Sequence, residues 1–167
     1  MSGFTIANGH ARCGGGIYCV SSSPTITNCV FRDNTAEYYE YVDPWLPLEN
    51  NSPMVNHDTG ARIKCPPPPP QRRGNGAGFC CVDSNTTLTS CKFTGNSAYE
   101  QGGGMYSSGG TPTLINCIFS ANFAGAGGGM SNLLGSSPTL TNCTFSGNSA
   151  EYGGGGMRNS DNSNPTL

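Results

Sequence analysis

The sequence contains little charge and little apolar material. Only 11% of its 167 residues are charged and 35% are hydrophobic, and both shares lie below those of an average soluble domain. The net charge is -2, so no basic surface for a polyanion is expected and nucleic acid is not a predicted partner. No apolar run has the length of a membrane-spanning helix, and no span is predicted.

This shortage of core-forming residues leaves two interpretations. A disordered, low-complexity chain is one of them, and the 25 glycines are compatible with it. Disorder usually comes with high net charge and few residues that favour strands. Here the net charge is small, and Thr, Ile, Phe and Tyr return at regular intervals. We therefore favour a repeat fold in which each repeat adds to a thin core.

Three cysteines recur at a constant spacing. Cys117 follows Cys91 by 26 residues and Cys143 follows Cys117 by 26, while the 62 residues from Cys29 to Cys91 equal one repeat plus an insertion of 36. A Thr-aliphatic step before the cysteine, a Phe-x-x-Asn motif after it and a glycine cluster keep the same register. The Phe-x-x-Asn motifs are Phe31 to Asn34, Phe93 to Asn96, Phe119 to Asn122 and Phe145 to Asn148. Columns in fixed register indicate tandem structural repeats.

Within each repeat the apolar residues alternate with polar ones, which predicts short β-strands. Met105, Leu114, Cys117 and Phe119 are expected to point inward. No segment has helical spacing, so each strand must pair in parallel with its equivalent in the next repeat. The predicted fold is all-β, a right-handed parallel β-helix (β-solenoid) of about five coils. We expect one domain over 1–167, with 37–73 as an inserted loop.

The repeated asparagines are assigned to corners of the coil. Corners need left-handed backbone, which glycine and then asparagine tolerate best. Asn28, Asn116 and Asn142 share one column, with Ser90 as its weaker member. We expect these side chains to form a hydrogen-bonded ladder along the axis.

The repeats resemble those of a known family. A Gly-Gly-apolar opening, as in Gly103-Gly104-Met105, is combined with the Phe-x-x-Asn motif. This combination is similar to the repeats of polymorphic outer-membrane proteins and, more broadly, of bacterial right-handed parallel β-helix repeat proteins. The resemblance covers nearly the whole chain outside the insertion. It implies a secreted or surface-displayed protein, and many members of these families are adhesins.

The nine cysteines fall into groups. The inward column of Cys29, Cys91, Cys117 and Cys143 has parallel Cβ vectors, a poor geometry for disulfides, and is expected to hold free thiols as apolar filler. Cys19 and Cys81 should also face inward. Cys13 and Cys65 are placed in loops and Cys80 on the outside, so a disulfide from Cys65 to Cys80 or Cys13 is a candidate in an oxidising compartment. A zinc site with His10 or His57 is the weaker alternative, because no C-x-x-C or H-x-x-x-H spacing is present.

The insertion differs from the repeats in composition. It carries Tyr38, Tyr39, Tyr41 and Trp45, and a pentaproline at 66–70 that is expected to form a stiff polyproline II segment. Long insertions in a uniform solenoid often carry recognition, and this aromatic cluster suits sugar stacking or protein contact. An equally good interpretation is that the rings only cover one flank of the coil.

No catalytic group is expected. Outward repeat positions are mostly Thr, Ser, Ile and Tyr, and the acids Asp33, Asp83, Glu100 and Glu151 are distributed over corners and turns. No paired carboxylates or Ser/His/Asp arrangement can be drawn from them. We expect no enzyme, no cofactor and no metal.

One outward face carries two files of mostly threonine. The files contain Thr25 and Thr27, Thr87 and Thr89, Thr113 and Ile115, Thr139 and Thr141, and Thr166. A flat Thr-x-Thr array resembles ice-binding faces. The simpler explanation is that threonine is a good outward residue of a parallel sheet.

The two ends of the sequence complement each other in register. The chain stops within a repeat at Pro165, Thr166 and Leu167, and it starts in the second half of one, with Phe4 in the expected phenylalanine position and Ile6 close behind. Open solenoid ends invite pairing with another chain. Head-to-tail stacking into a fibre is therefore one expectation, and a fragment of a longer solenoid is the other.

Three functions follow from these features. The first is an extracellular or cell-surface structural or adhesive module, which binds itself, surface proteins or glycans. The second is a carbohydrate-binding or polysaccharide-cleaving β-helix that uses the insertion. The third is ice binding through the threonine files.

Overall fold

The computed structural model describes residues 1–37 and 74–167, which form 19 short strands and no helix. The strands make up four parallel sheets, here named A to D. Sheet A contains β4 (Thr25–Thr27), β8 (Thr87–Thr89), β12 (Thr113–Ile115) and β16 (Thr139–Thr141). Sheet B contains β1 (Thr5–Ala7), β5 (Val30–Arg32), β9 (Lys92–Thr94), β13 (Ile118–Ser120) and β17 (Thr144–Ser146).

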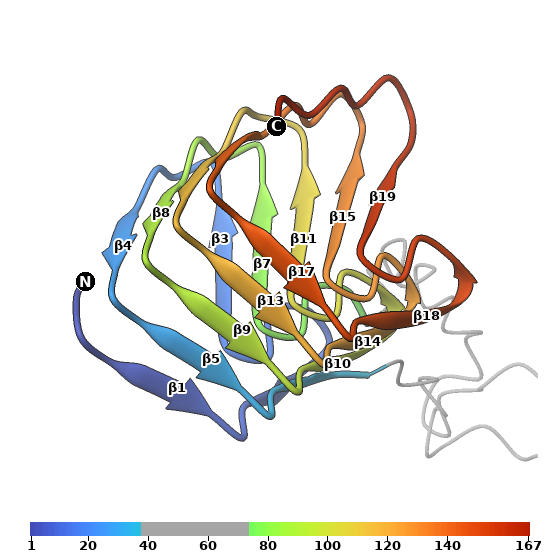
Figure 1. The fold of residues 1–167 in the computed structure, drawn as a ribbon, viewed down its shortest axis with the longest axis horizontal. Coiled ribbons are helices and arrows are strands. Elements are labelled where there is room, and N and C mark those ends of the chain that lie inside the picture. Colours follow the sequence, from blue (N-terminus) through green and yellow to red (C-terminus); the bar gives the residue numbers. More distant parts are fainter. Residues whose placement is uncertain (38–73) are drawn as a thin grey trace, which may run out of the picture. The chain divides into compact units, whose positions relative to one another are not determined.

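The other two sheets complete each coil. Sheet C contains β2 (His10–Ala11), β6 (Thr35–Ala36), β10 (Ser97–Gln101), β14 (Phe123–Ala126) and β18 (Ser149–Gly153). Sheet D contains β3 (Ile17–Val20), β7 (Phe79–Val82), β11 (Met105–Ser108), β15 (Met130–Leu133) and β19 (Met157–Asn159). In Figure 1 the successive coils lie side by side in chain order.

Every strand pairs in parallel with its equivalent one coil away, so the predicted β-solenoid of about five coils is confirmed. Leu114 pairs with Leu88 on one side and with Leu140 on the other. The coils before and after the insertion also stack directly, because Ile26 pairs with Leu88. The insertion therefore leaves the register of the coils unchanged.

The core consists of columns of identical or similar apolar side chains stacked along the axis. Met105, Leu114, Cys117 and Phe119 are all fully buried, as predicted. The rings of Phe31, Phe93, Phe119 and Phe145 stack with centroids 4.6 to 4.7 Å apart and planes within 7° of parallel. This spacing is that of neighbouring strands, so the coil repeat itself brings the rings into offset contact.

A column of glycines lets the coils approach beside these rings. A Cβ on Gly104 would lie 2.5 Å from the carbonyl oxygen of Gly129 and 2.8 Å from a ring carbon of Phe119. Both distances are shorter than real Cβ contacts. Gly102, two residues earlier, has φ +67°, which is a left-handed conformation that other residues rarely adopt.

The asparagine ladder lies in a different column from the predicted one. It runs through the asparagines of the Phe-x-x-Asn motifs, of which Asn34, Asn96 and Asn122 are fully buried. Nδ2 of Asn96 donates to the carbonyl of Phe31 at 3.0 Å and to Oδ1 of Asn122 at 2.9 Å. That Oδ1 also accepts from the backbone N–H of Asn96 at 3.0 Å. Each amide is thereby bonded through both its donor and its acceptor groups.

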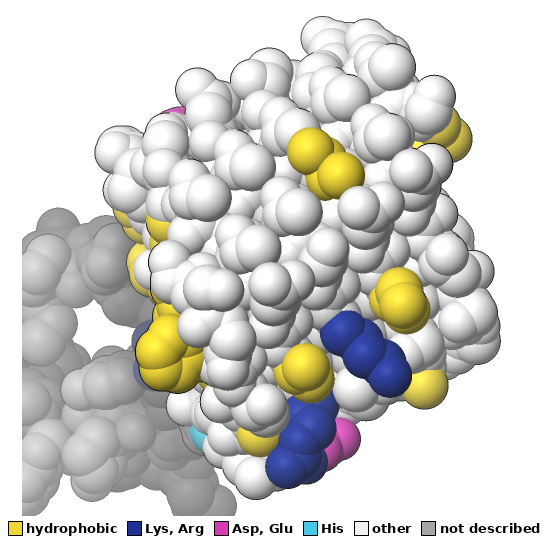
Figure 2. Space-filling model, turned by 60° about the vertical axis from the view of Figure 1, so that its left-hand side comes forward, with side chains coloured by type: hydrophobic (Ala, Val, Ile, Leu, Met, Phe, Trp, Pro, Cys, Tyr) yellow, Lys and Arg dark blue, Asp and Glu magenta, His cyan; other side chains and the backbone are white. Residues whose placement is uncertain are grey.

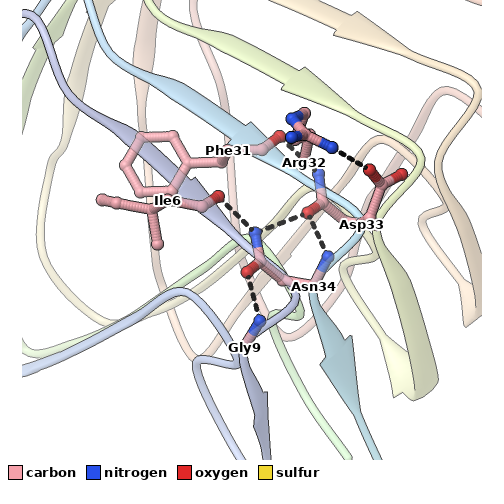
Figure 3. Close-up of polar contacts among 7 residues, drawn as sticks. Ile6, Gly9, Phe31, Arg32, Asp33 and Asn34 are labelled. Carbon is pink, nitrogen blue, oxygen red and sulfur yellow. Dashed lines mark hydrogen bonds and ion pairs between the residues drawn. The ribbon is translucent and has the colours of Figure 1, made fainter.

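The first member of this ladder is drawn in Figure 3. Nδ2 of Asn34 points to the carbonyl oxygen of Ile6 at 3.0 Å, and its Oδ1 accepts from the backbone N–H of Gly9 at 2.9 Å. On the outside of the same turn Arg32 donates to Asp33 at 2.7 Å. The inner side of the corner is thus closed by amides, while the outer side carries the charges.

The column that was expected to form the ladder has another role. Asn28, Ser90, Asn116 and Asn142 have φ between 53° and 54°, so their predicted left-handed backbone is confirmed. Their side chains are exposed. The prediction of a ladder here was wrong because the residue with left-handed backbone turns its side chain into solvent. The ladder asparagines instead directly follow the left-handed residue of their own corner, as Asn34 follows Asp33.

The register of the first coil also differs from the sequence alignment. Ile6, not Phe4, pairs with Phe31 and packs against the core. Phe4 is 57% exposed. The alignment failed because the first coil keeps the spacing of the motif but has Ile6 in the phenylalanine position and Gly9 in the asparagine position, so that Phe4 was matched to the phenylalanine column instead.

Asn122→Ala is expected to lower the free energy of unfolding by about 2–4 kcal/mol, because it removes an acceptor from the buried Asn96 amide and a donor from the carbonyl of Phe93. Urea denaturation measures this change. Asn116→Gly is the matched control: Asn116 recurs at the same interval in another column, but it is exposed with φ 54°, and we expect no loss. Equal effects of the two changes would contradict the assignment of the ladder.

Candidate functional site

The outward face of sheet A carries the two threonine files. Thr113 pairs with Thr87 and Thr139, and Ile115 pairs with Thr89 and Thr141. A bridge from Thr139 to Thr166 continues the first file. Figure 2 shows a side of the molecule on which few side chains are charged and Lys and Arg gather near one edge. The files are therefore straight and in register.

The cysteine column lies inside the corner between sheets A and B. Cys29, Cys91 and Cys117 are buried and Cys143 is half-buried, and all four are free thiols. The thiol of Cys117 donates to the carbonyl of Leu88 in the previous coil and to that of Ile115 in its own coil, both at 3.5 Å. These thiols act as weak donors to backbone carbonyls.

Cys81 is a strongly perturbed thiol of the interior. It is fully buried in sheet D, and its Sγ donates to the hydroxyl oxygen of Ser107 at 3.3 Å. Burial raises the pKa of Cys81 from 9.0 to about 12, although the Ser107 contact opposes this shift. The thiol stays protonated and unreactive at neutral pH.

The candidate disulfide involves Cys13, Cys65 and Cys80. Cys65 lies outside the described residues, so its pairing stays a prediction. Cys13 is half-buried next to the bridge with Asn75. Cys80 occupies an outward position of β7, yet it is buried, because the backbone near Gly76 folds over it: a Cβ on Gly76 would lie 2.7 Å from that of Cys80.

The remaining predicted residues are placed as follows. Tyr38, Tyr39, Tyr41 and Trp45 lie outside the described residues. Leu167 is 88% exposed, and Pro165 is half-buried. Within 1–37 and 74–167 no three His, Cys, Asp or Glu side chains are grouped to hold a metal ion. The same residues contain no helix that is long and apolar enough to cross a membrane.

A groove on the outer face of sheet C is the candidate functional site. Its volume is about 430 Å³, which lies within the usual range of small-molecule sites. The described side chains around it combine aromatic rings with acids. They are Thr35, Ala36, Glu37, Ser97, Ala98, Tyr99, Phe123, Glu151 and Tyr152.

The groove exists because one coil is shorter than its neighbours in sheet C. Ala98 pairs with Ala124, and Ala124 pairs with Ala150. After these alanines the register shifts on both sides of β14. Gly125 follows in the middle coil, and a Cβ there would lie 2.7 Å from the carbonyl oxygen of Glu100. The middle coil thus has no side chain at the point where its neighbours carry tyrosines.

The aromatic rings border this gap from three coils. Tyr152 on β18 is 83% exposed, Tyr99 on β10 is 62% exposed and Phe123 on β14 is 40% exposed. An edge carbon of Tyr152 lies 3.2 Å from the Cβ position of Gly125, so its ring reaches over the short coil. Three partly exposed rings in one groove are unusual for a surface made mostly of Thr, Ser and Asn.

Carboxylates make the groove acidic. Glu151 accepts a hydrogen bond from Tyr152, and this contact with its negative charge raises the pKa of the Tyr152 hydroxyl. At the other end, Oε2 of Glu37 lies 3.3 Å from Nε2 of His10. From the sequence, Glu151 was expected at a corner or turn apart from the other acids, but the fold brings Glu37 and Glu151 to the same groove.

A signal for this site was present in the sequence. The alanine of sheet C is followed by a glutamate and a tyrosine in three coils, as Ala36-Glu37-Tyr38, Ala98-Tyr99-Glu100 and Ala150-Glu151-Tyr152. The fourth coil has Ala124-Gly125-Ala126. Alternation alone did not reveal the groove, because the order of the two residues changes between coils and the strand is bulged there.

Comparison with known proteins supports the fold. A family model described as right handed beta helix region matches residues 72–167. No curated protein and no solved structure matches the chain. The family match agrees with the predicted right-handed parallel β-helix, while the narrower similarity to polymorphic outer-membrane proteins stays a prediction.

Alkaline pH is expected to destabilise the protein through Cys81. The unfolded thiol ionises near 9.0 and the folded thiol near 12, so between these values only the unfolded state has lost the proton. The contribution of Cys81 to the free energy of unfolding is therefore fully present below pH 9. It falls as the pH rises above 9, by at most about 1.4 kcal/mol per pH unit for this group.

Urea denaturation of the wild type and of Cys81→Ala between pH 8 and 10.5 measures the effect. The wild type should lose stability more steeply, because tyrosines and lysines titrate equally in both proteins. Parallel pH profiles would contradict a buried, protonated Cys81.

Proposed function

The chain belongs to the right-handed β-helix family, and we propose that it is an extracellular adhesive module that binds carbohydrate in the groove of sheet C. The single observation that supports this proposal is the exposure of Tyr99, Phe123 and Tyr152 around one acidic groove. Aromatic rings present a flat apolar face to the C–H face of a sugar ring, and neighbouring carboxylates accept hydrogen bonds from hydroxyls.

The rest of the molecule suits a scaffold. Sheets A, B and D keep a constant register from coil to coil, and buried amides and thiols bond along the axis. Such a scaffold holds the groove rigidly, so little conformational freedom is lost on binding. A repetitive surface of uncharged polar residues is also compatible with the extracellular location that the resemblance implies.

The β-helix family includes polysaccharide-cleaving enzymes, and cleavage is the competing activity for the same groove. We favour binding because the described acids have other contacts. Glu37 lies beside His10, and Glu151 lies next to the Tyr152 hydroxyl, whose pKa it raises. Incubation of the protein with the saccharides that it binds tests this preference: the release of shortened products would assign an enzyme instead.

Tyr152→Ala is expected to weaken saccharide binding about tenfold, since loss of one stacking ring removes about 1.4 kcal/mol. Tyr99→Ala should have a similar effect. A glycan array identifies ligands of the wild type, and calorimetry with the best of them measures each variant.

Ile118→Ala is the control for this experiment, because Ile118 is 42% exposed but lies on sheet B. It should bind as the wild type does. If the wild type binds no saccharide, or if both tyrosine variants bind unchanged, the groove is not a glycan site.

Ice binding is a second candidate, favoured by the straight register of Thr113, Thr139 and Thr166. A flat file of threonines at strand spacing is its main requirement. Thermal hysteresis in the wild type that disappears in the double variant Thr89→Lys, Thr141→Lys would support it. Wild-type protein without hysteresis would end it.

A further inference from the structure

The groove of sheet C is acidic throughout its described lining. Glu37 and Glu151 contribute carboxylates from coils at its two ends, and none of the described lining residues is basic. The basic residues His10, Arg12 and Arg158 of the described part of the chain are not among the lining residues. His10 contacts Glu37 from β2 at 3.3 Å, and Arg158 donates to Gln101 at 2.9 Å. The groove is therefore a poor site for uronic acids or sulfated sugars, whose charges would be repelled.

The aromatic rings of the groove also attract positively charged groups. The face of an aromatic ring is electron-rich and attracts cations within about 6 Å of its centroid. Tyr99 and Tyr152 come from coils on either side of the shorter coil at Gly125, and the ring of Tyr152 reaches over that glycine. A ligand in the gap lies against these rings with Glu151 next to it.

The contact between Glu151 and Tyr152 shows the local sign of the field. The neighbouring carboxylate makes it harder for the Tyr152 hydroxyl to become an anion, so the pKa of Tyr152 is raised. The same field favours a positive charge at this point. A preference for positive charge also agrees with the lining of the groove, which contains two glutamates and no described basic residue.

We propose that the saccharide bound by this groove is an amino sugar with a free ammonium group, such as an oligomer of deacetylated hexosamine. This inference rests on the proposed carbohydrate-binding function. The C–H face of the pyranose stacks on Tyr152 or Tyr99, and the ammonium donates to the carboxylate of Glu151. An N-acetylated sugar keeps the stacking but loses the charge-assisted hydrogen bond.

Calorimetry with two chemically defined oligomers tests the proposal. Fully deacetylated and fully N-acetylated glucosamine hexamers are titrated into the whole protein at a pH at which the sugar amine is protonated. The deacetylated hexamer should bind at least about tenfold more tightly, as one charge-assisted hydrogen bond is worth about 1.5–3 kcal/mol. Added salt should reduce this preference.

Variants separate the charge from the rings. Glu151→Gln keeps the shape of the side chain and should remove most of the preference for the deacetylated hexamer. Tyr152→Ala should weaken both hexamers. Asp83→Asn removes an equal charge from an exposed corner outside the groove, and should change neither affinity. Thermal melts confirm that all three variants are folded.

The outcomes distinguish this inference from the proposed function. Equal or tighter binding of the N-acetylated hexamer or of a uronate oligomer, with the same loss in Tyr152→Ala, overturns the amino-sugar assignment and leaves carbohydrate binding intact. An unchanged preference in Glu151→Gln also overturns it, as does an equal effect of Asp83→Asn. If no saccharide binds at all, both proposals fail.

Discussion

Parallel pairing of each coil with the next is the interaction on which the rest of the structure depends. The backbone of each coil is hydrogen-bonded to its neighbours, for example from the N–H of Thr113 to the carbonyl of Thr86 and from the N–H of Thr139 to the carbonyl of Pro112 in the preceding coil. Because the register is constant, equivalent side chains lie about 4.8 Å apart. Any side chain that packs well against its own copy is therefore favoured in every coil. The phenylalanine stack and the amide ladder both meet this condition.

The same constraint explains how such a small apolar fraction supports a fold. Asn96 and Asn122 are buried polar groups, yet each is fully hydrogen-bonded, so burial brings no desolvation penalty that is not offset. The glycines near Gly104 have no Cβ atom, so neighbouring coils can approach closely there. The interior needs few large residues, because amides, thiols and alanines fill the remainder.

A uniform scaffold makes local irregularities informative. The short coil at Gly125 interrupts an otherwise regular sheet and opens the groove between Tyr99 and Tyr152. A regular column there would have given a closed file of tyrosines, with no room for a ligand between them. The candidate site thus arises from a difference in length between coils, and its chemistry arises from the residues that flank this difference.

The sequence by itself determined the parallel solenoid, the inward column from Cys29 to Cys143 and the left-handed corner at Asn116, because a fixed repeat length carries strand direction and register with it. It did not determine which asparagine column forms the ladder, since Asn116 and Asn122 recur at the same interval and only the curvature of the coil turns one inward. Tertiary structure also decided that Cys80 is buried and that Glu37 and Glu151 share a groove. These outcomes depend on distances between coils and on where a strand bulges, which residue spacing along one chain does not encode.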